Sequence, residues 1–215
     1  MATQTTSFQG TKFYLGVGLN EGKAVTAATV KPNATITATG HGAKTGDFVK
    51  ITGLGALDGF YPVKSIATDK ITLADEVDWS GQDAPTDFSS AKVAVVKWSS
   101  NFCAIKQIEG DGDTLGEEDI TTMCSEGTET EAGEIEYGSI KLTFFYAPAT
   151  PMQQDLRKKF YAKETFPWMI LKNGQGSLYG TGFIQTSPNF SGEVKGKFDS
   201  GVTIKKAKRD YHLPV

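Results

Sequence analysis

The chain has 215 residues and a formal net charge of −3, with 39% hydrophobic and 22% charged residues. This composition suffices for one large or two small globular domains, excludes disorder over most of the chain, and provides no overall field that would attract nucleic acid or an anionic membrane. The 24 glycines and the abundance of Thr and Val favour short strands over long helices, so the sequence predicts a mainly β fold.

The sequence predicts strands over most of the first hundred residues. Residues 1–9 are polar and predict an extended arm, and residues 10–18 predict a strand between glycines. From Ala24 to Val96, short alternating runs are separated by turn signals at the spacing of a small barrel or sandwich. This stretch therefore predicts a self-contained β-module, with strands at residues 34–39, 48–51, 70–73 and 91–98.

The next segment is strongly acidic. After a predicted strand at 102–108, residues 109–136 hold 11 acidic side chains, and no Lys or Arg occurs between Lys106 and Lys141. From Lys141 onward the balance inverts, with 12 of the 22 basic residues against 5 acids. The small net charge thus conceals two regions of opposite charge.

One helix is predicted, after a strand at 140–146 whose even-numbered residues are all apolar. Thr150 is a suitable N-cap, Pro151 suits the first helical position, and Gln153 completes a capping box. Met152, Leu156 and Phe160 lie on one helical face. Strands are then predicted at residues 166–171, 178–186, 192–198 and 202–206.

The residues offer no catalytic constellation. His41 and His212 are the only histidines, and they stand in unrelated parts of the chain. Cys103 and Cys124 lack metal-site spacing and are expected to be buried free thiols. Residues 109–113 alternate carboxylates with glycine, but position 12 of such a calcium loop is Ile120. We therefore predict no catalytic residues, no metal and no cofactor.

The order of several elements along the chain is informative. A strand at 10–18 is followed by Glu118-Asp119-Ile120-Thr121-Thr122, by the run from Gly133 to Phe144, by Tyr146-Ala147-Pro148 and the helix, and by Gly180-x-Gly182-Phe183-Ile184. In this order they resemble the major tail tube protein of long-tailed, non-contractile bacteriophages. The stretch between residues 20 and 99 resembles the small β-modules inserted in phage structural proteins.

This resemblance implies a β-sandwich or barrel with one flanking α-helix, formed by residues 1–22 and 98–215, and an inserted small β-domain, residues 23–97, projecting outward. It implies a non-enzymatic virion protein that assembles in the host cytoplasm. Copies would form hexameric rings that stack into a tube, contact other tail proteins at its ends, and let genome DNA pass without specific binding. No membrane insertion is expected.

Two groups of charged residues are candidates for assembly. The acidic candidates for lining the bore or stacking rings are Glu109, Asp111, Asp113, Glu117, Glu118 and Asp119, and a solvated acidic loop is the alternative. The basic candidates for contacts with a neighbouring subunit are Arg157, Lys158, Lys159 and Lys163, and a solvated helix face is the alternative.

A different function also fits the composition. The chain could be a carbohydrate- or host-surface-binding β-module protein, for which Tyr61 and Trp79 are the candidate exposed aromatics. A hydrolase on a β-scaffold would need a convergent carboxylate pair, which the sequence does not identify.

Overall fold

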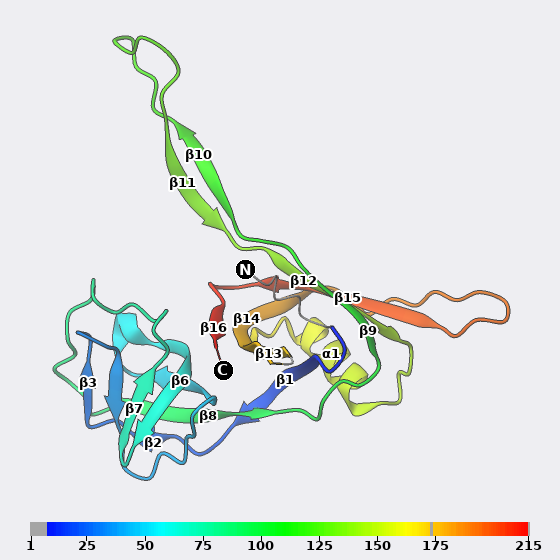
Figure 1. The fold of residues 1–215 in the computed structure, drawn as a ribbon, viewed down its shortest axis with the longest axis horizontal. Coiled ribbons are helices and arrows are strands. Elements are labelled where there is room, and N and C mark those ends of the chain that lie inside the picture. The colour runs from blue at the N-terminus through cyan, green and yellow to red at the C-terminus, as the bar shows by residue number, and fades with distance from the viewer. Residues whose placement is uncertain (1–7, 173, 215) are drawn as a thin grey trace. The chain divides into compact units, whose positions relative to one another are not determined.

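A computed structural model describes residues 8–172 and 174–214. The fold is mainly β with one α-helix in the described residues, as predicted (Figure 1). The arm expected at residues 1–9 lies almost entirely outside the described part. The chain divides into two compact units, the first made of Met1–Cys103, Phe166–Thr181 and Asp210–Val215, the second of Ala104–Thr165 and Gly182–Arg209.

The first unit contains an antiparallel sheet in the order β3-β4-β7-β6-β5-β8-β1-β13, with β2 paired to β8. The strand β14 (Gly176–Thr186) begins in this unit and pairs there with β16 (Tyr211–Leu213). The other strands are β1 (Lys12–Leu19), β2 (Lys23–Ala24), β3 (Ala27–Thr29), β4 (Thr35–Thr37), β5 (Phe48–Thr52), β6 (Gly59–Ala67), β7 (Lys70–Leu73), β8 (Lys92–Trp98) and β13 (Phe166–Lys172), with a short 3-10 helix η1 (Gly55–Leu57).

The β-module has its own hydrophobic core. A cluster of buried side chains runs from Val25 to Val95 and includes Ile36, Ile51 and Ile71, which are fully buried. Alternation along the strands puts these residues on one face, as the sequence pattern predicts. The buried cluster falls within residues 23–97, while the compact unit also takes in β13, part of β14 and β16. The boundaries of an inserted domain therefore stay a prediction.

An aromatic cluster joins this module to β14 inside the first unit. The ring of Phe48 stacks on Tyr179 at 5.2 Å and on Trp98 at 6.2 Å between centroids. The Tyr179 hydroxyl also donates a hydrogen bond to the carbonyl of Gly46. The next residue, Gly180, has to be glycine because a Cβ there would lie 2.3 Å from the Trp168 ring.

The second unit is built on β9 (Ile105–Gly110), β12 (Ser139–Phe145), β15 (Asp199–Lys206) and the last part of β14, in the antiparallel order β14-β15-β12-β9. Ile140, Leu142 and Phe144 of β12 are buried, which confirms the predicted apolar face. Val202 and Ile204 of β15, paired with Leu142 and Ile140, are buried as well.

The helix α1 (Pro151–Ala162) begins at the predicted residue but is capped differently. The Thr150 hydroxyl donates to the carbonyl of Ala147 rather than accepting from the helix. The Gln153 amide donates to the carbonyl of Phe145 and accepts from the Ala147 N–H. Gln153 therefore fixes the turn before the helix, and the predicted capping box does not form.

The predicted strand at 192–198 is wrong. Among these residues no strand forms, and the adjacent β15 is one continuous strand rather than a bulged continuation. Lys195 has a φ of 79°, a left-handed conformation that breaks an extended run, and Val194 is fully exposed. The apolar residues that suggested a strand here, Val194 and Phe198, are exposed and do not form a buried strand face.

Candidate functional site

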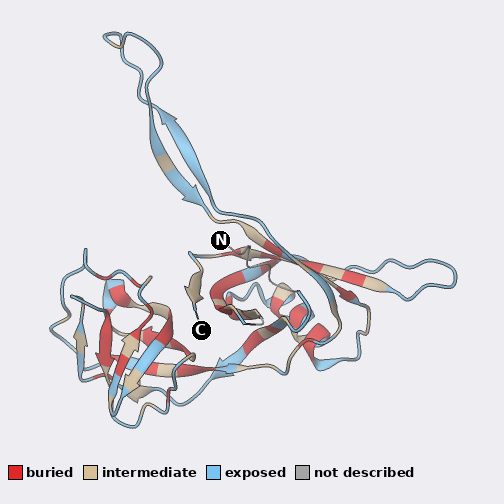
Figure 2. Ribbon diagram, viewed as in Figure 1, coloured by how far each residue is buried: buried red, intermediate tan, exposed pale blue. Residues whose placement is uncertain are grey.

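The acidic run forms a hairpin that leaves the sheet of the second unit. The strands β10 (Thr114–Asp119) and β11 (Thr130–Glu136) pair only with each other, with Leu115 opposite Ile135. They continue the β9–β12 pair, in which Gly110 is opposite Ile140. Every residue of β10 is exposed, and nearly all of the hairpin is drawn as exposed in Figure 2.

The hairpin carries a dense negative charge. Its residues 114–136 contain eight carboxylates and no Lys or Arg. Two of these carboxylates, on Glu118 and Glu131, belong to directly opposite residues. Like charges in opposite positions destabilise strand pairing, so the hairpin is poorly suited to stand alone in water. Its carboxylates are Glu117, Glu118, Asp119, Glu126, Glu129, Glu131, Glu134 and Glu136.

Apolar side chains are exposed on the same hairpin. Leu115 and Ile135 are 58% and 57% exposed, and Met123 in the connecting loop is fully exposed. Ile120 is also exposed. Because these side chains lie among carboxylates and are not packed in a core, they are candidates for an interaction surface.

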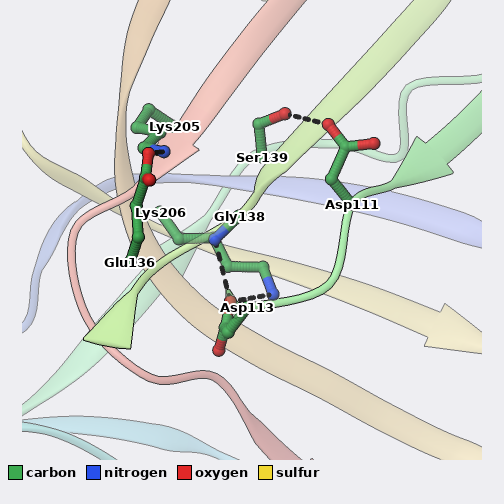
Figure 3. A network of polar contacts seen from close by, with 7 residues as sticks. All are labelled: Asp111, Asp113, Glu136, Gly138, Ser139, Lys205 and Lys206. Carbon is green, nitrogen blue, oxygen red and sulfur yellow. Dashed lines mark hydrogen bonds and ion pairs between the residues drawn. The ribbon is translucent and has the colours of Figure 1, made fainter. Parts of the chain in front are cut away.

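The base of the hairpin is held by an ion pair (Figure 3). Asp113 Oδ1 accepts hydrogen bonds from the backbone N–H of Gly138 at 2.9 Å and from Lys206 Nζ at 3.1 Å. The Lys206 side chain is only 8% exposed and that of Asp113 is 27% exposed. Burial alone would raise the pKa of Asp113, but the Gly138 N–H and the Lys206 ammonium together lower it below its ordinary value.

Two further contacts lie beside this pair. The Ser139 hydroxyl donates to Asp111 Oδ2 at 2.6 Å and, with Lys141, lowers the pKa of that carboxyl. Lys205 Nζ lies 3.0 Å from Glu136 Oε1. These contacts connect the junctions on both sides of the hairpin to β12 and β15.

Gly138 makes the junction possible. A Cβ at this position would lie 2.2 Å from the carbonyl oxygen of Asp111 and 2.6 Å from that of Gly112. The two chain segments approach so closely that only glycine fits, which explains why Gly138 stands where β11 passes into β12.

The structure separates the predicted acidic residues into two sets. Asp111 and Asp113 bind side chains of β12 and β15 at the junction, and Glu109 accepts from the Gln107 amide on β9. The remaining three lie exposed along β10: Glu117, Glu118 and Asp119. Sequence reasoning missed Lys205, Lys206, Glu136 and Ser139, because no spacing along the chain links Asp113 to a lysine 93 positions later.

The four predicted basic residues differ in their exposure. Arg157 and Lys158 are exposed on α1, where the Arg157 guanidinium lies 5.9 Å from the centre of the exposed Tyr161 ring. Lys163 is exposed just after the helix. Lys159, however, is buried, and its Nζ lies 2.8 Å from Glu164 Oε1 within the same chain. The burial of Lys159 and its pairing within the chain do not favour the contact with a neighbouring subunit that was expected of it.

Two other expectations about side-chain exposure are wrong. Tyr61 and Trp79 are buried, with their rings in an edge contact at 5.3 Å, so they cannot form an exposed aromatic platform. Cys103 and Cys124 are free but exposed, Cys124 in the loop that joins β10 to β11. A small β-module fills its core with aromatics, and the hairpin that carries Cys124 has no core in which to bury a thiol.

The described residues contain no group of three or more His, Cys, Asp or Glu side chains that could hold a metal ion. His41 hydrogen-bonds the backbone through both ring nitrogens, to the Ala43 N–H and the Thr68 carbonyl. No helix in the described part of the chain is long and apolar enough to cross a membrane.

Comparison with known proteins finds similarity among solved structures. A chain of "Virion of native gene transfer agent (GTA) particle" is 14% identical, with a TM-score of 0.43 over 53% of this chain and 88% of that one. A chain of "Tail of empty GTA particle computed with helical refinement, C6 symmetry" is 16% identical, with a TM-score of 0.43 over 53% and 85%. A chain of the SPP1 tail tube is 13% identical, with a TM-score of 0.40 over 65% and 74%. No family model and no curated protein matches the sequence.

Proposed function

We propose that this chain is a structural subunit of a virion tail, and that copies of it form hexameric rings stacked into a tube through which genome DNA passes. The observation that carries the proposal is the β10–β11 hairpin. It exposes apolar side chains and like charges that a lone monomer leaves without cover, which suits an element completed by another copy. The resemblance of the sequence to tail tube proteins points the same way.

The charge distribution supports a conduit rather than a nucleic-acid-binding protein. Asp111 and Asp113 are paired with lysines, while Glu117, Glu118 and Asp119 have no cationic partner among the described residues. Six copies would together carry a formal charge of −18, six times −3. If unpaired carboxylates line the bore, they repel phosphates, and DNA slides without binding.

Residues 23–97 are proposed as an inserted domain that projects outward from the tube, since a central channel has no room for it. The buried side chains of its core all come from within the module, and Tyr211 and Leu213 of the same chain pack against them. The subunits would assemble in the host cytoplasm, meet other tail proteins at the tube ends, and remain in the virion. No catalytic role is proposed.

Electron microscopy of the concentrated purified protein tests this function. Rings or tubes with a central channel are expected. A protein that stays monomeric at high concentration and binds a glycan array would instead favour a carbohydrate-binding module, a function for which Tyr61 and Trp79 no longer provide an exposed surface.

The helix α1 provides a matched pair of variants for the same assay. Arg157→Glu with Lys158→Glu should leave the monomer folded and hinder assembly, because both side chains are exposed. Lys159→Glu should unfold or destabilise the monomer, because it places a second carboxylate beside Glu164 at a buried position. Normal tubes from the Arg157 and Lys158 variant would remove these two residues from the interface.

A further inference from the structure

Two paired tyrosines of the first unit contact the β-module. Tyr179 and Tyr211 are directly opposite residues of the antiparallel β14–β16 pair. The Tyr179 ring stacks on Phe48 at 5.2 Å between centroids, and the Tyr211 ring lies 6.1 Å from that of Tyr61. Phe48 belongs to β5 and Tyr61 to its neighbour β6, so both tyrosines contact the same part of the module.

The two contacts lie on opposite faces of the module sheet. Tyr61 is opposite Val49, the residue after Phe48, in the β5–β6 register. Because successive residues of a strand point to opposite faces, Phe48 and Tyr61 point to different sides of the sheet. Tyr61 is accordingly part of the module core, whereas Phe48 packs with Tyr179 in a separate cluster. Tyr179 and Tyr211 therefore contact the module from both sides.

Hydrogen bonds accompany both ring contacts. The Tyr179 hydroxyl donates to the carbonyl of Gly46, just before β5. The backbone N–H of His212 donates to Glu76 Oε2 of the module at 2.9 Å. The His212 ring nitrogen Nε2 lies 3.1 Å from the carbonyl oxygen of Gln175, in the turn that precedes β14. The backbone of β16 is thus bound to the module, and its histidine ring to the start of β14.

All three residues of β16 contact the module as well as β14. Tyr211 does so through its ring, His212 through its N–H, and Leu213 by packing against the module core. The two strands also approach closely, since a Cβ on Gly176 would lie 2.1 Å from the carbonyl oxygen of Leu213. A strand of three residues has little stability of its own, so these contacts are what β16 contributes to the fold.

We propose that β16 is a clamp that holds the β-module in one orientation on β13 and β14, with Tyr179 on one face of the module sheet and Tyr211 on the other. Domains joined only by linkers move relative to each other, whereas a module held from both sides moves with the strands that hold it. The module is then a rigid projection rather than a flexible appendage. Every contact lies within one chain, so the inference does not require the proposed assembly.

Nitrogen-15 relaxation of the full-length protein in dilute solution tests the clamp. The tumbling of module amides, such as those of Ile36 and Ile71, is compared with that of the Ile170 amide on β13. One common rotational correlation time is expected for the wild type. Two distinct correlation times would show a freely attached module and overturn the proposal. Failure of the proposed function would appear separately, as the absence of rings or tubes at high concentration.

Release of β16 provides the second test. Tyr211→Ala with Glu76→Ala removes one ring contact and the acceptor of the His212 N–H. The module amides should then lose the common correlation time and tumble faster than the Ile170 amide, while keeping the chemical shifts of a folded module. Glu76→Ala alone, which removes no ring, should give a smaller change in the same direction.

Tyr161→Ala with Glu126→Ala is the matched control, since it makes the same two changes at exposed positions of the second unit. It should leave the common correlation time unchanged. A common correlation time that persists in the clamp variant would contradict the proposal. Unfolding of the module in that variant would contradict it as well, because Tyr211 would then support the module core rather than the orientation of the module.

Discussion

The β-module and the acidic hairpin are both antiparallel β structures, yet they are stabilised in opposite ways. The module encloses fully buried side chains from several strands, including Ile36 and Ile71, which are opposite each other on β4 and β7. The hairpin has a single pair of strands, exposed apolar residues and two opposed glutamates. The module therefore encloses a core of its own, to which Tyr211 and Leu213 of the same unit add, whereas the hairpin encloses none.

Among the described residues, the contacts that support the hairpin are at its base. Asp113 and Lys206 connect the junction to β15, and beyond it the strands have no other layer to pack on in the described chain. These contacts fix the position at which the hairpin leaves the sheet, and the strands β10 and β11 beyond them stay exposed. From this comparison we expect mutations in the module and at the junction to lower the stability of the monomer. Mutations along the hairpin should instead reduce assembly.

Ile71→Ala should have the largest effect on stability. The substitution removes fully buried methyl and methylene groups from the module core, which costs about 3 kcal/mol of unfolding free energy. Urea unfolding followed by the fluorescence of Trp79, which is buried in the same core, measures it. The neighbouring Lys70→Ala, at an exposed position of the same strand, should change stability by less than about 0.5 kcal/mol. Similar values for the two variants would contradict the burial of Ile71 in the module core.

Asp113→Asn should destabilise the hairpin base by about 1–2 kcal/mol, because the buried Lys206 ammonium loses its carboxylate. The lowered pKa of Asp113 means that its contribution is fully present above the carboxyl pKa of the unfolded chain and is lost as the pH falls through the lower folded value. The difference between wild type and variant should thus be constant from pH 7 to about pH 5 and shrink below about pH 4. Hydrogen exchange of the Gly138 amide, which donates to Asp113, reports it locally. A difference independent of pH would exclude the ion pair as its cause.

How far the sequence predicts this molecule depends on the range of the interaction. Strands such as 140–146 follow from alternation, and α1 from Pro151 and its apolar spacing, because both are local patterns. The residue type that suits a helix cap can also be recognised locally. Gln153 nevertheless binds the turn before the helix, and the position of that turn depends on where β12 ends. Local patterns fix elements better than they fix the partners of polar side chains.

The candidate site was predictable in charge but not in geometry. The acidic run is visible in the sequence, and so is the absence of compensating cations. Two contacts depend on the order of β9, β12 and β15 in the sheet. Asp113 pairs with Lys206, and the ammonium groups of Lys106 and Lys197 both lie near the Phe145 ring. Exposure of Tyr61 and Trp79 was predicted wrongly because aromatic residues in a small module serve equally well as core or surface.

Glu118→Lys should stabilise the isolated hairpin while weakening assembly. It replaces the repulsion between Glu118 and Glu131 by an attraction worth up to about 1 kcal/mol across the strands. Slower exchange of the β10 and β11 amides in the monomer would show the gain. The same variant should assemble less well, because it reverses a charge on the hairpin that the proposed assembly completes with another copy. Glu118→Gln, which relieves the repulsion without adding a cation, separates the two effects.

Leu115→Ser with Ile135→Ser should have the smallest effect on the monomer. These opposed residues are both more than half exposed, so the double variant should change the unfolding free energy of the monomer by less than about 0.5 kcal/mol. Assembly should still be reduced, since burial of such side chains against another copy would be lost. Sedimentation of concentrated protein measures assembly, and thermal unfolding of dilute protein measures the monomer. A large loss of monomer stability would mean that the hairpin is packed within its own chain, and the contrast between a module with a core and a hairpin without one would fail.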